Sequence, residues 1–446
     1  MLLGIDVGTT RLKAVAIDAG GAVRAGAAVP TPFTTTADGV EMPVADLGRA
    51  LAEVIAALGP LREEVAAVGL AGMAESGAPL RAGRPLAPVI AWHDGRGEET
   101  VASLQVRFGA DLPRWTGRRV RTVSSVAKLG WLLDHGLPEP DRWLGVPELA
   151  LFLLTGAEVT EHSLAARTGA YSVSERRWLP EVIDHVIGAT GRARRREAGG
   201  RLGPGAGPGE GAAIGPVGGP GEGAAIGGLF PPVRAAGAVM GRIGNEAGAE
   251  YGLPAGIPVT IAGHDHLAAA AGLGAGPGDL LNSVGTAETV LRRLDAAPDV
   301  DRALELDLAV TLWPGGDAWA VLASATRAGP VVEALAADLG VAPGDLDGLT
   351  GAAAERWIVT TRTLAGSTAA AAGRIAALAG PHQRLVVFGG GSRSPVWLRA
   401  KAAAVGVPVV RGPAEAAARG AALAAGVAAG WWATPPADPT PAGGRN

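Results

Sequence analysis

A turn of glycine and threonine follows a carboxylate near the start of the chain and stands between two apolar runs. The runs, residues 2–7 and 12–18, predict adjacent strands, and a glycine in the turn lets the backbone approach a ligand without a Cβ in the way. Threonine hydroxyls and backbone N–H groups suit phosphate oxygens, and the carboxylate suits a hard cation such as Mg2+. The groups concerned are Asp6, Gly8, Thr9 and Thr10. The same residues also fit an ordinary hairpin with a solvated aspartate.

The same arrangement of strand, turn and strand recurs in the second half of the chain. It spans residues 280–291, with Gly285 and Thr286 in the turn. Just before it, the apolar run 257–262 ends in a polar cluster and passes into an Ala-rich helix, which puts Asp265 at the carboxyl end of a strand. Open α/β sheets bind ligands at such strand ends. Two Gly-Thr hairpins, each with an aspartate at a neighbouring strand end, resemble the phosphate clamp of the actin-like ATPase fold.

Two interpretations of Asp265 stand side by side. An aspartate in this position suits a general base that takes a proton from an attacking hydroxyl. An aspartate at a helix start also caps the helix, and one residue can do both. The flanking His264 and His266 suggest a metal site, but the sequence offers no thiolate and no evident third ligand. The alternative is that the two histidines orient the substrate or the aspartate.

Length and composition exclude several classes of protein. A chain of 446 residues is long for one core and predicts two domains with an active site between them. The net charge of -4 offers no general attraction to nucleic acid or an anionic membrane, so a small-molecule partner is expected. The absence of cysteine excludes disulfides, thiolate metal sites and a cysteine nucleophile. With neither a signal-peptide pattern nor a long apolar run, we expect a soluble, cytoplasmic protein.

Strand-like and helical runs alternate over most of the chain, which indicates an α/β architecture. A segment at about residues 199–228 interrupts the pattern: it is dominated by Gly, Pro, Ala and Glu and contains Gly-Pro-Gly-Glu-Gly-Ala-Ala-Ile-Gly twice. We expect a flexible insertion there, because such a composition buries too little apolar surface to offset its ordering entropy. The predicted domains are residues 1–248 and 249–430, followed by a disordered tail at 431–446.

In its order of motifs the sequence resembles the FGGY family of carbohydrate kinases, up to about residue 430. The phosphate motifs of that family resemble Asp6-Val-Gly-Thr-Thr-Arg-Leu-Lys13 and Ser283-Val-Gly-Thr-Ala287. Its adenosine motif resembles Gly389-Gly-Gly-Ser-Arg-Ser-Pro-Val-Trp397. Its W-x-D-x-R segment resembles Trp92-His-Asp-Gly-Arg96. Two ribonuclease H-like, actin-like ATPase domains with an active-site cleft between them are therefore the implied fold.

The resemblance also implies which residues act. Asp265 corresponds to the base, and Asp6 and Asp265 lie around Mg2+ and the γ-phosphate of ATP. The nucleotide contacts implied by the family motifs are Asp6, Gly8, Thr9, Thr10, Lys13, Gly285, Thr286, Gly329, Gly390, Gly391 and Ser394. Such a site suits phosphoryl transfer, in which the protein mainly positions reactants and neutralises charge.

The acceptor is left open by the sequence. In the family, sugar contacts come from the loop that holds Glu75 and Ser76 here, and from the W-x-D-x-R segment. Trp92 would lie against the carbon face of a sugar, whereas Asp94 and Arg96 fit either a substrate contact or an ion pair that fixes their loop. His264 and His266 complete the expected acceptor set. The pattern Met-Ala-Glu around Glu75 matches neither xylulose kinases nor glycerol kinases, so a ketose, a polyol and a sugar acid all stay open.

The predicted function is ATP-dependent phosphorylation of a hydroxyl on a small carbohydrate, EC class 2.7.1. A catalytically silent sugar- and nucleotide-binding regulatory protein of the same fold is the alternative. A third interpretation is an Hsp70-like or actin-like ATPase. It has less support, because the W-x-D-x-R segment found here belongs to the sugar kinases and not to those ATPases. We expect no nucleic-acid or membrane partner, and a homodimer stays open.

Overall fold

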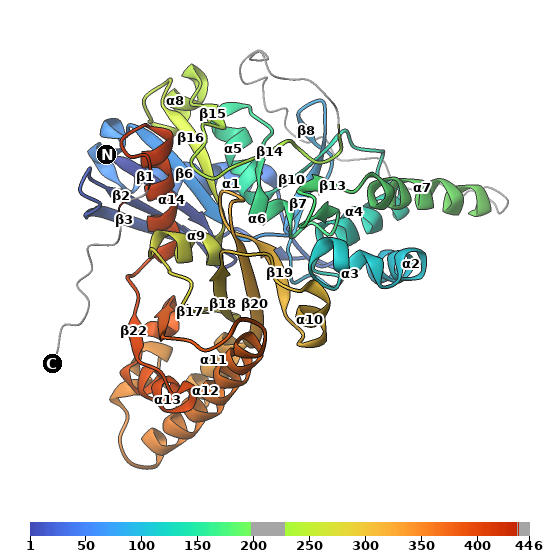
Figure 1. The fold of residues 1–446 in the computed structure, drawn as a ribbon. Helices are drawn as coiled ribbons and strands as arrows, with labels where there is room; N and C mark the ends of the chain where they lie inside the picture. Colours follow the sequence, from blue (N-terminus) through green and yellow to red (C-terminus); the bar gives the residue numbers. More distant parts are fainter. Residues whose placement is uncertain (198–227, 435, 437–446) are drawn as a thin grey trace.

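A computed structural model describes residues 1–197, 228–434 and 436, and Figure 1 shows the arrangement. The predicted insertion at about 199–228 falls almost wholly outside these residues, as does most of the tail predicted from residue 431. Two lobes are stacked with a cavity between them, which confirms the α/β class expected from the sequence.

The first lobe is built on a six-stranded sheet in the order β15-β16-β6-β1-β2-β3. β1 runs antiparallel to β2 and parallel to β6, and β6 runs parallel to β16. The strands are β1 (Leu2–Val7), β2 (Arg11–Ile17), β3 (Val23–Pro30), β6 (Ala67–Gly72), β15 (Gly241–Arg242) and β16 (Pro258–His264). The two strands predicted at the start of the chain, residues 2–7 and 12–18, are confirmed within one residue as β1 and β2.

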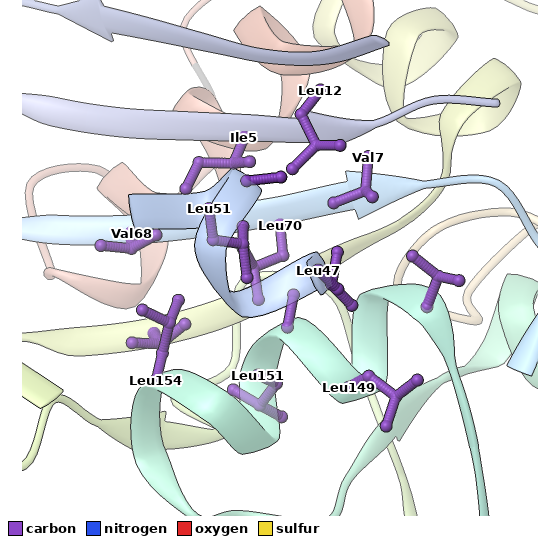
Figure 2. Packing of buried hydrophobic residues seen from close by; sticks show 14 of the residues in the cluster. Ile5, Val7, Leu12, Leu47, Leu51, Val68, Leu70, Leu149, Leu151 and Leu154 are labelled. Carbon is purple, nitrogen blue, oxygen red and sulfur yellow. The ribbon is translucent and has the colours of Figure 1, made fainter. Parts of the chain in front are cut away.

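The two faces of this sheet bury different helices, because side chains alternate along a strand. Leu3, Ile5 and Val7 face α1 (Val44–Ala56) and α5 (Val146–Thr155) in a large apolar core, of which Figure 2 shows part. Leu2 packs on the opposite face against α14 (Ala416–Ala428). Asp6 has the same parity as Leu2 and therefore points toward the α14 side.

A second sheet of the first lobe, in the order β10-β7-β9-β5-β4 with β8 paired to β7, extends it toward α2 and α4. Its strands are β4 (Thr34–Thr35), β5 (Val40–Met42), β7 (Gly77–Arg81), β8 (Arg84–Pro85), β9 (Val89–Ile90) and β10 (Arg142–Gly145). The accompanying helices are η1 (Gly59–Glu64), α2 (Glu98–Phe108), α3 (Asp111–Thr116), α4 (Ser125–Asp134), α6 (His162–Ala165), α7 (Pro180–Glu197) and α8 (Asn245–Tyr251). Short pairs join β11 (Thr160–Glu161) to β14 (Val233–Arg234) and β12 (Tyr171–Ser172) to β13 (Arg177–Trp178).

The second lobe repeats the plan of the first with a six-stranded sheet in the order β19-β20-β18-β17-β21-β22. Its strands are β17 (Asp279–Val284), β18 (Glu288–Leu294), β19 (Ala309–Leu312), β20 (Trp319–Thr326), β21 (Arg384–Phe388) and β22 (Val409–Arg411). One face is covered by the 29-residue helix α12 (Gly351–Ala379), the longest of the described helices. The remaining helices are α10 (Val300–Glu305), α11 (Ala328–Asp338), η2 (Pro343–Gly348), η3 (Gly390–Arg393) and α13 (Pro395–Val405).

Two helices lie between the sheets of the two lobes: α14 and α9 (Asp265–Gly272). Glycines bring them close to their neighbours. A Cβ on Gly4 would lie 1.8 Å from the carbonyl oxygen of Ala418, and one on Gly420 would lie 2.1 Å from that of Ala268. Helix α9 follows β16 directly, so the backbone that carries Asp265 is fixed by this packing.

The strand predicted to open the second domain, residues 257–262, pairs with β6 in the sheet of the first lobe as β16. The division at residues 248 and 249 stays a proposal about domains. No helix within the described ranges is long and apolar enough to cross a membrane.

Candidate active site

A cavity of about 760 Å³ lies between the lobes and is lined by the turns of both Gly-Thr hairpins. Most of the predicted site residues line it together, although they come from distant parts of the sequence. Those residues are Asp6, Gly8, Thr9, Thr10, Lys13, Glu75, Trp92, His264, Asp265, His266, Gly285, Thr286 and Gly390. The remaining predicted residues, Ser76, Asp94, Arg96, Gly329, Gly391 and Ser394, are not among the lining residues.

The first hairpin places a carboxylate and a lysine side by side. Asp6 and Lys13 are register partners on β1 and β2. Lys13 Nζ lies 2.6 Å from Glu415 Oε2, in the turn before α14. In the turn itself, Thr9 Oγ1 accepts a hydrogen bond of 2.9 Å from Trp92 Nε1, which ties the hairpin to the loop that holds Trp92.

Asp6 is 8% exposed, and its Oδ1 is buried without a partner among the described residues. Burial first, and then the charge of Asp265, raise the pKa of Asp6 to about 8. A carboxylate oxygen that is buried, unpartnered and held near a second carboxylate fits an oxygen-preferring dication. The donor set is therefore suited to Mg2+.

Asp265 has one oxygen fixed and one free. Its Oδ1 accepts a hydrogen bond of 2.6 Å from the backbone N–H of His266 and lies 3.1 Å from His264 Nε2. Its Oδ2 makes no hydrogen bond or ion pair within the described part of the chain. A carboxylate that lines a cavity and is held through one oxygen suits a general base.

The two histidines hold Asp265 from both sides. Burial above all, and then the charges of His266, Arg167 and Arg118, hold the pKa of His264 well below its usual range, so His264 is neutral. His266 Nδ1 lies 3.0 Å from Ser283 Oγ on β17 and 3.5 Å from Asp265 Oδ1. Ligand atoms of His264, Asp265 and His266 lie within 4.8 Å of one another, so a metal ion at this trio stays a second possibility in geometric terms. The hydrogen bonds favour the orienting role for the histidines.

The second hairpin is supported from behind by a buried ion pair. Glu288, the first residue of β18, accepts hydrogen bonds through Oε1 from Lys401 Nζ of α13 and, at 2.6 Å, from Thr368 Oγ1 of α12. The side chains of Lys401 and Glu288 are 0% exposed. Gly329 packs against the turn, where a Cβ would lie 2.8 Å from the Cα of Thr286. Both contacts fix the turn from the side away from the cavity.

The predicted adenosine motif forms the turn between β21 and α13. Gly390 lines the cavity, whereas a Cβ on Gly391 would meet Val284 Cγ1 at 2.4 Å. Ser394 caps α13, since its Oγ accepts a hydrogen bond of 3.0 Å from the N–H of Trp397. In this structure Gly391 and Ser394 thus shape the turn, and a direct nucleotide contact by either stays a prediction.

Glu75, which also lines the cavity, forms ion pairs with two arginines. Glu75 Oε1 lies 2.6 Å from Arg118 Nη1 and 2.7 Å from Arg167 Nη2. The two arginines hold the pKa of Glu75 below its usual range in spite of the opposing effect of burial, the largest single influence. Glu75 has a backbone φ of 71°, a left-handed conformation that is uncommon outside glycine and that often marks functional sites.

The alternatives for Asp94 and Arg96 are distinguished by geometry. Arg96 donates through Nε and Nη2 to the two oxygens of Asp94, at 2.9 Å each, and through Nη1 to Glu41 at 2.6 Å. Its guanidinium lies 4.7 Å from the Trp131 ring centre. Asp94 also accepts from the backbone N–H of Val40. These contacts favour the loop-fixing ion pair.

Several cavity residues were absent from the predicted site: Arg118, Arg119, Arg121, Arg167, Arg393 and Glu415. Arg167 lies within the part of the chain that resembles the FGGY family, so the sequence offered a signal by which this cation could have been found. Nothing in the local sequence around Glu415 marks it, because it meets Lys13 only through the packing of α14 on the first sheet.

Comparison with known proteins identifies the family. The profile for the N-terminal domain of the FGGY family of carbohydrate kinases matches residues 1–190, and that for the C-terminal domain matches residues 354–429. The chain belongs to the FGGY family. An L-fuculokinase from Escherichia coli K12 is 26% identical to this FGGY protein over 338 residues, which is 72% of this chain and 63% of the relative. The chain thus spans less than two thirds of the length of the curated L-fuculokinases it matches.

Solved structures show the same fold. A xylulose kinase from Rhodospirillum rubrum superposes with a TM-score of 0.75 at 21% identity, covering 96% of this chain and 92% of that one. A glycerol kinase from Plasmodium falciparum with ADP gives a TM-score of 0.73 at 15% identity, covering 96% and 90%. The two-lobed, actin-like fold of FGGY proteins predicted from the sequence is therefore confirmed.

Proposed function

We propose that this FGGY protein transfers the γ-phosphoryl group of ATP to a hydroxyl of a small carbohydrate. The observation that supports this proposal most directly is the geometry of Asp265. Its Oδ1 is fixed by hydrogen bonds to its neighbours, its Oδ2 makes none among the described residues, and the residue lines a cavity that both Gly-Thr turns also line. Acceptor contacts are proposed for Glu75, Trp92, His264 and His266. The regulatory alternative is not favoured, since binding alone does not require an oriented base.

In the proposed reaction, Asp265 Oδ2 accepts the proton of the acceptor hydroxyl as its oxygen forms a bond to the γ-phosphorus. The bond from that phosphorus to the β–γ bridging oxygen breaks, and ADP leaves. Lys13 and the turn N–H groups of residues 9, 10, 286 and 287 would compensate phosphate charge, whereas the N–H groups of Gly8 and Gly285 donate to the carbonyls of Arg11 and Ala287. Positioning and charge compensation supply most of the catalysis in such a mechanism.

Asp6 and Asp265 would hold Mg2+, because their oxygens include the unpartnered Asp6 Oδ1. The bound dication would offset phosphate charge. What the chain itself contributes is the burial of Asp6, which removes competing water from its carboxylate, and the hydrogen bond that keeps Asp265 Oδ1 fixed.

Replacement of the base tests the proposal. We expect Asp265→Asn to lower kcat by about 10²–10⁴-fold, because the amide cannot accept the proton. Its thermal unfolding should stay close to that of the wild type, since the side chain is nearly isosteric. The measurement is coupled detection of ADP release over a panel of ketoses, polyols and sugar acids.

Asp111→Asn serves as the matched control. Asp111 is the first residue of α3, as Asp265 is of α9, but its side chain is 63% exposed. It should keep wild-type turnover. An Asp265→Asn enzyme with the wild-type rate would refute the assigned base, and a wild type silent toward every acceptor would refute the kinase.

A further inference from the structure

Three charged side chains meet in the cavity wall and leave an excess of positive charge. Arg118 and Arg167 approach the same oxygen, Glu75 Oε1, at 2.6 and 2.7 Å, so two guanidinium charges face one carboxylate charge. All three residues line the cavity. The side chains of Arg118, Glu75 and Arg167 are 9%, 6% and 16% exposed, and charges this deeply placed are weakly screened by water.

Both guanidinium groups keep most of their hydrogen-bonding capacity. Each carries several N–H donors in a planar fork. Within the described ranges, Glu75 is the only acceptor that either guanidinium contacts, and Arg167 Nε is buried without a partner. A buried donor without a partner is unfavourable, whereas a planar anion would accept from such a fork through two oxygens.

The electrostatics agree with this geometry. Burial above all, and then the charge of Arg118, lower the pKa of Arg167 to about 10, as expected for a buried cation with a like charge beside it. Asp265 also acts on Arg167, so the base and the cationic pair lie within electrostatic reach of each other.

We infer that the acceptor is a sugar acid, whose carboxylate is bound by Arg118 and Arg167 while one of its hydroxyls lies at Asp265. This inference rests on the proposed kinase function and names its substrate class. A neutral sugar or polyol would leave the two guanidinium groups sharing Glu75 as their one contacting carboxylate among the described residues. The carboxylate of a sugar acid would balance the excess positive charge of the two arginines. It would stay chemically unchanged, because only the hydroxyl at Asp265 reacts.

Matched acceptor pairs test the inference. Aldonates of four to six carbons are each compared with the alditol of the same configuration, which differs in the carboxylate alone. We expect at least one aldonate to exceed its alditol about tenfold or more in kcat/KM. Binding to the Asp265→Asn variant, measured by calorimetry, should show the same preference without turnover.

The outcomes separate the two proposals. Faster turnover of the alditol, or equal binding of both members of every pair, overturns the sugar acid and leaves the kinase standing. Silence of every acceptor in turnover, with aldonate alone bound, overturns the kinase and supports the anion site. Binding of neither member in any pair overturns the sugar acid.

Charge-balanced variants then locate the carboxylate site. Arg118→Gln removes the excess charge and should raise KM for the aldonate about tenfold more than it raises KM for the alditol. The double variant Arg118→Gln, Glu75→Gln restores one net positive charge through Arg167 and should recover part of the loss.

Arg107→Gln on the exposed surface of α2 is the control for net charge and should have no effect. Thermal unfolding of each variant checks the fold. Equal changes in KM for aldonate and alditol in Arg118→Gln would contradict a carboxylate site at this residue.

Discussion

Asp6 is buried where its own charge is unfavourable, and this has a consequence that can be measured. Its pKa, raised to about 8 from an ordinary 3.8, means that the folded protein holds a proton which the unfolded chain has lost. Between about pH 4 and 8 the folded state binds more protons, so stability falls as the pH rises through this window. Below it both states are protonated, and the effect disappears.

Asp6→Asn should therefore stabilise the protein increasingly from pH 5 to pH 8, by a few °C at the upper end. Thermal unfolding without divalent cations measures this, with Asp38→Asn, an exposed aspartate, as the control for charge. Millimolar Mg2+ should raise the melting temperature of the wild type at pH 8 and not that of Asp6→Asn. A difference between variant and wild type that is the same at every pH would contradict the buried-acid interpretation.

For single residues, the sequence indicates which side chains belong to the site better than it indicates which side chains they contact. Asp6, Lys13 and Asp265 were identifiable because each lies next to a strand end with a distinctive turn. The ion pairs of Arg118 and Arg167 with Glu75 could not be identified from the sequence, because the three residues lie on separate segments that only folding brings together. Ser394 caps α13 through a local hydrogen bond from the N–H of Trp397, and its predicted nucleotide contact stays a prediction.

Among the elements, the two hairpins and the Ala-rich helix α9 were predicted well, whereas helix α14 was not predicted. Alternation and a Gly-Thr turn are local signals, and β1, β2, β17 and β18 follow them. Helix α14 is rich in Ala and Gly, with almost no polar face to give a period, so its apolar pattern is weak. Its place on the sheet depends on glycines in other elements.

Gly69 makes that dependence testable. A Cβ there would lie 1.9 Å from the carbonyl oxygen of Ala421 on α14, and backbone cannot move aside as a side chain does. Gly69→Ala should lower the free energy of unfolding by about 3 kcal/mol, as overpacking of a tight core does. Urea unfolding measures the change.

Gly26→Ala in β3 of the same sheet is the control, because its Cβ would come no closer than 3.6 Å to Ala14 O. The change there should stay within about 1 kcal/mol. Equal stabilities for Gly69→Ala and Gly26→Ala would show that α14 is not held by close approach.

For the whole molecule, the sequence predicted two halves around one site but not how they touch. The contacts between the lobes include an exposed ion pair, Arg114 with Asp301 at 2.6 Å, a backbone hydrogen bond of 2.7 Å from the N–H of Val310 to the carbonyl of Gly117, and a more buried contact at Glu161. In the buried contact, the N–H of Gly315 in the second lobe donates a hydrogen bond of 3.1 Å to Glu161 Oε1 in the first. An exposed pair contributes about 0–1 kcal/mol, so the buried contact is the stronger candidate for holding the lobes together.

Glu161 also connects this contact to the base. Its Oε2 accepts from the N–H and the hydroxyl of Ser163, and Ser163 Oγ accepts a hydrogen bond of 2.9 Å from the N–H of His264. In Glu161→Gln an amide NH2 replaces one acceptor and must face a donor, at Gly315 or at Ser163.

We expect Glu161→Gln to lower the melting temperature by several °C and to speed deuterium exchange at the Gly315 amide. Because the variant also disturbs the support of His264, kcat should fall more than KM rises. Glu158→Gln is the matched control, since Glu158 pairs with Arg142 inside the first lobe at 2.6 Å, three residues before Glu161. Unchanged exchange at Gly315 in Glu161→Gln would mean that this hydrogen bond does not hold the lobes, and that closure depends on their other contacts, among them the packing of α9 and α14 and the hydrogen bond from Val310 to Gly117.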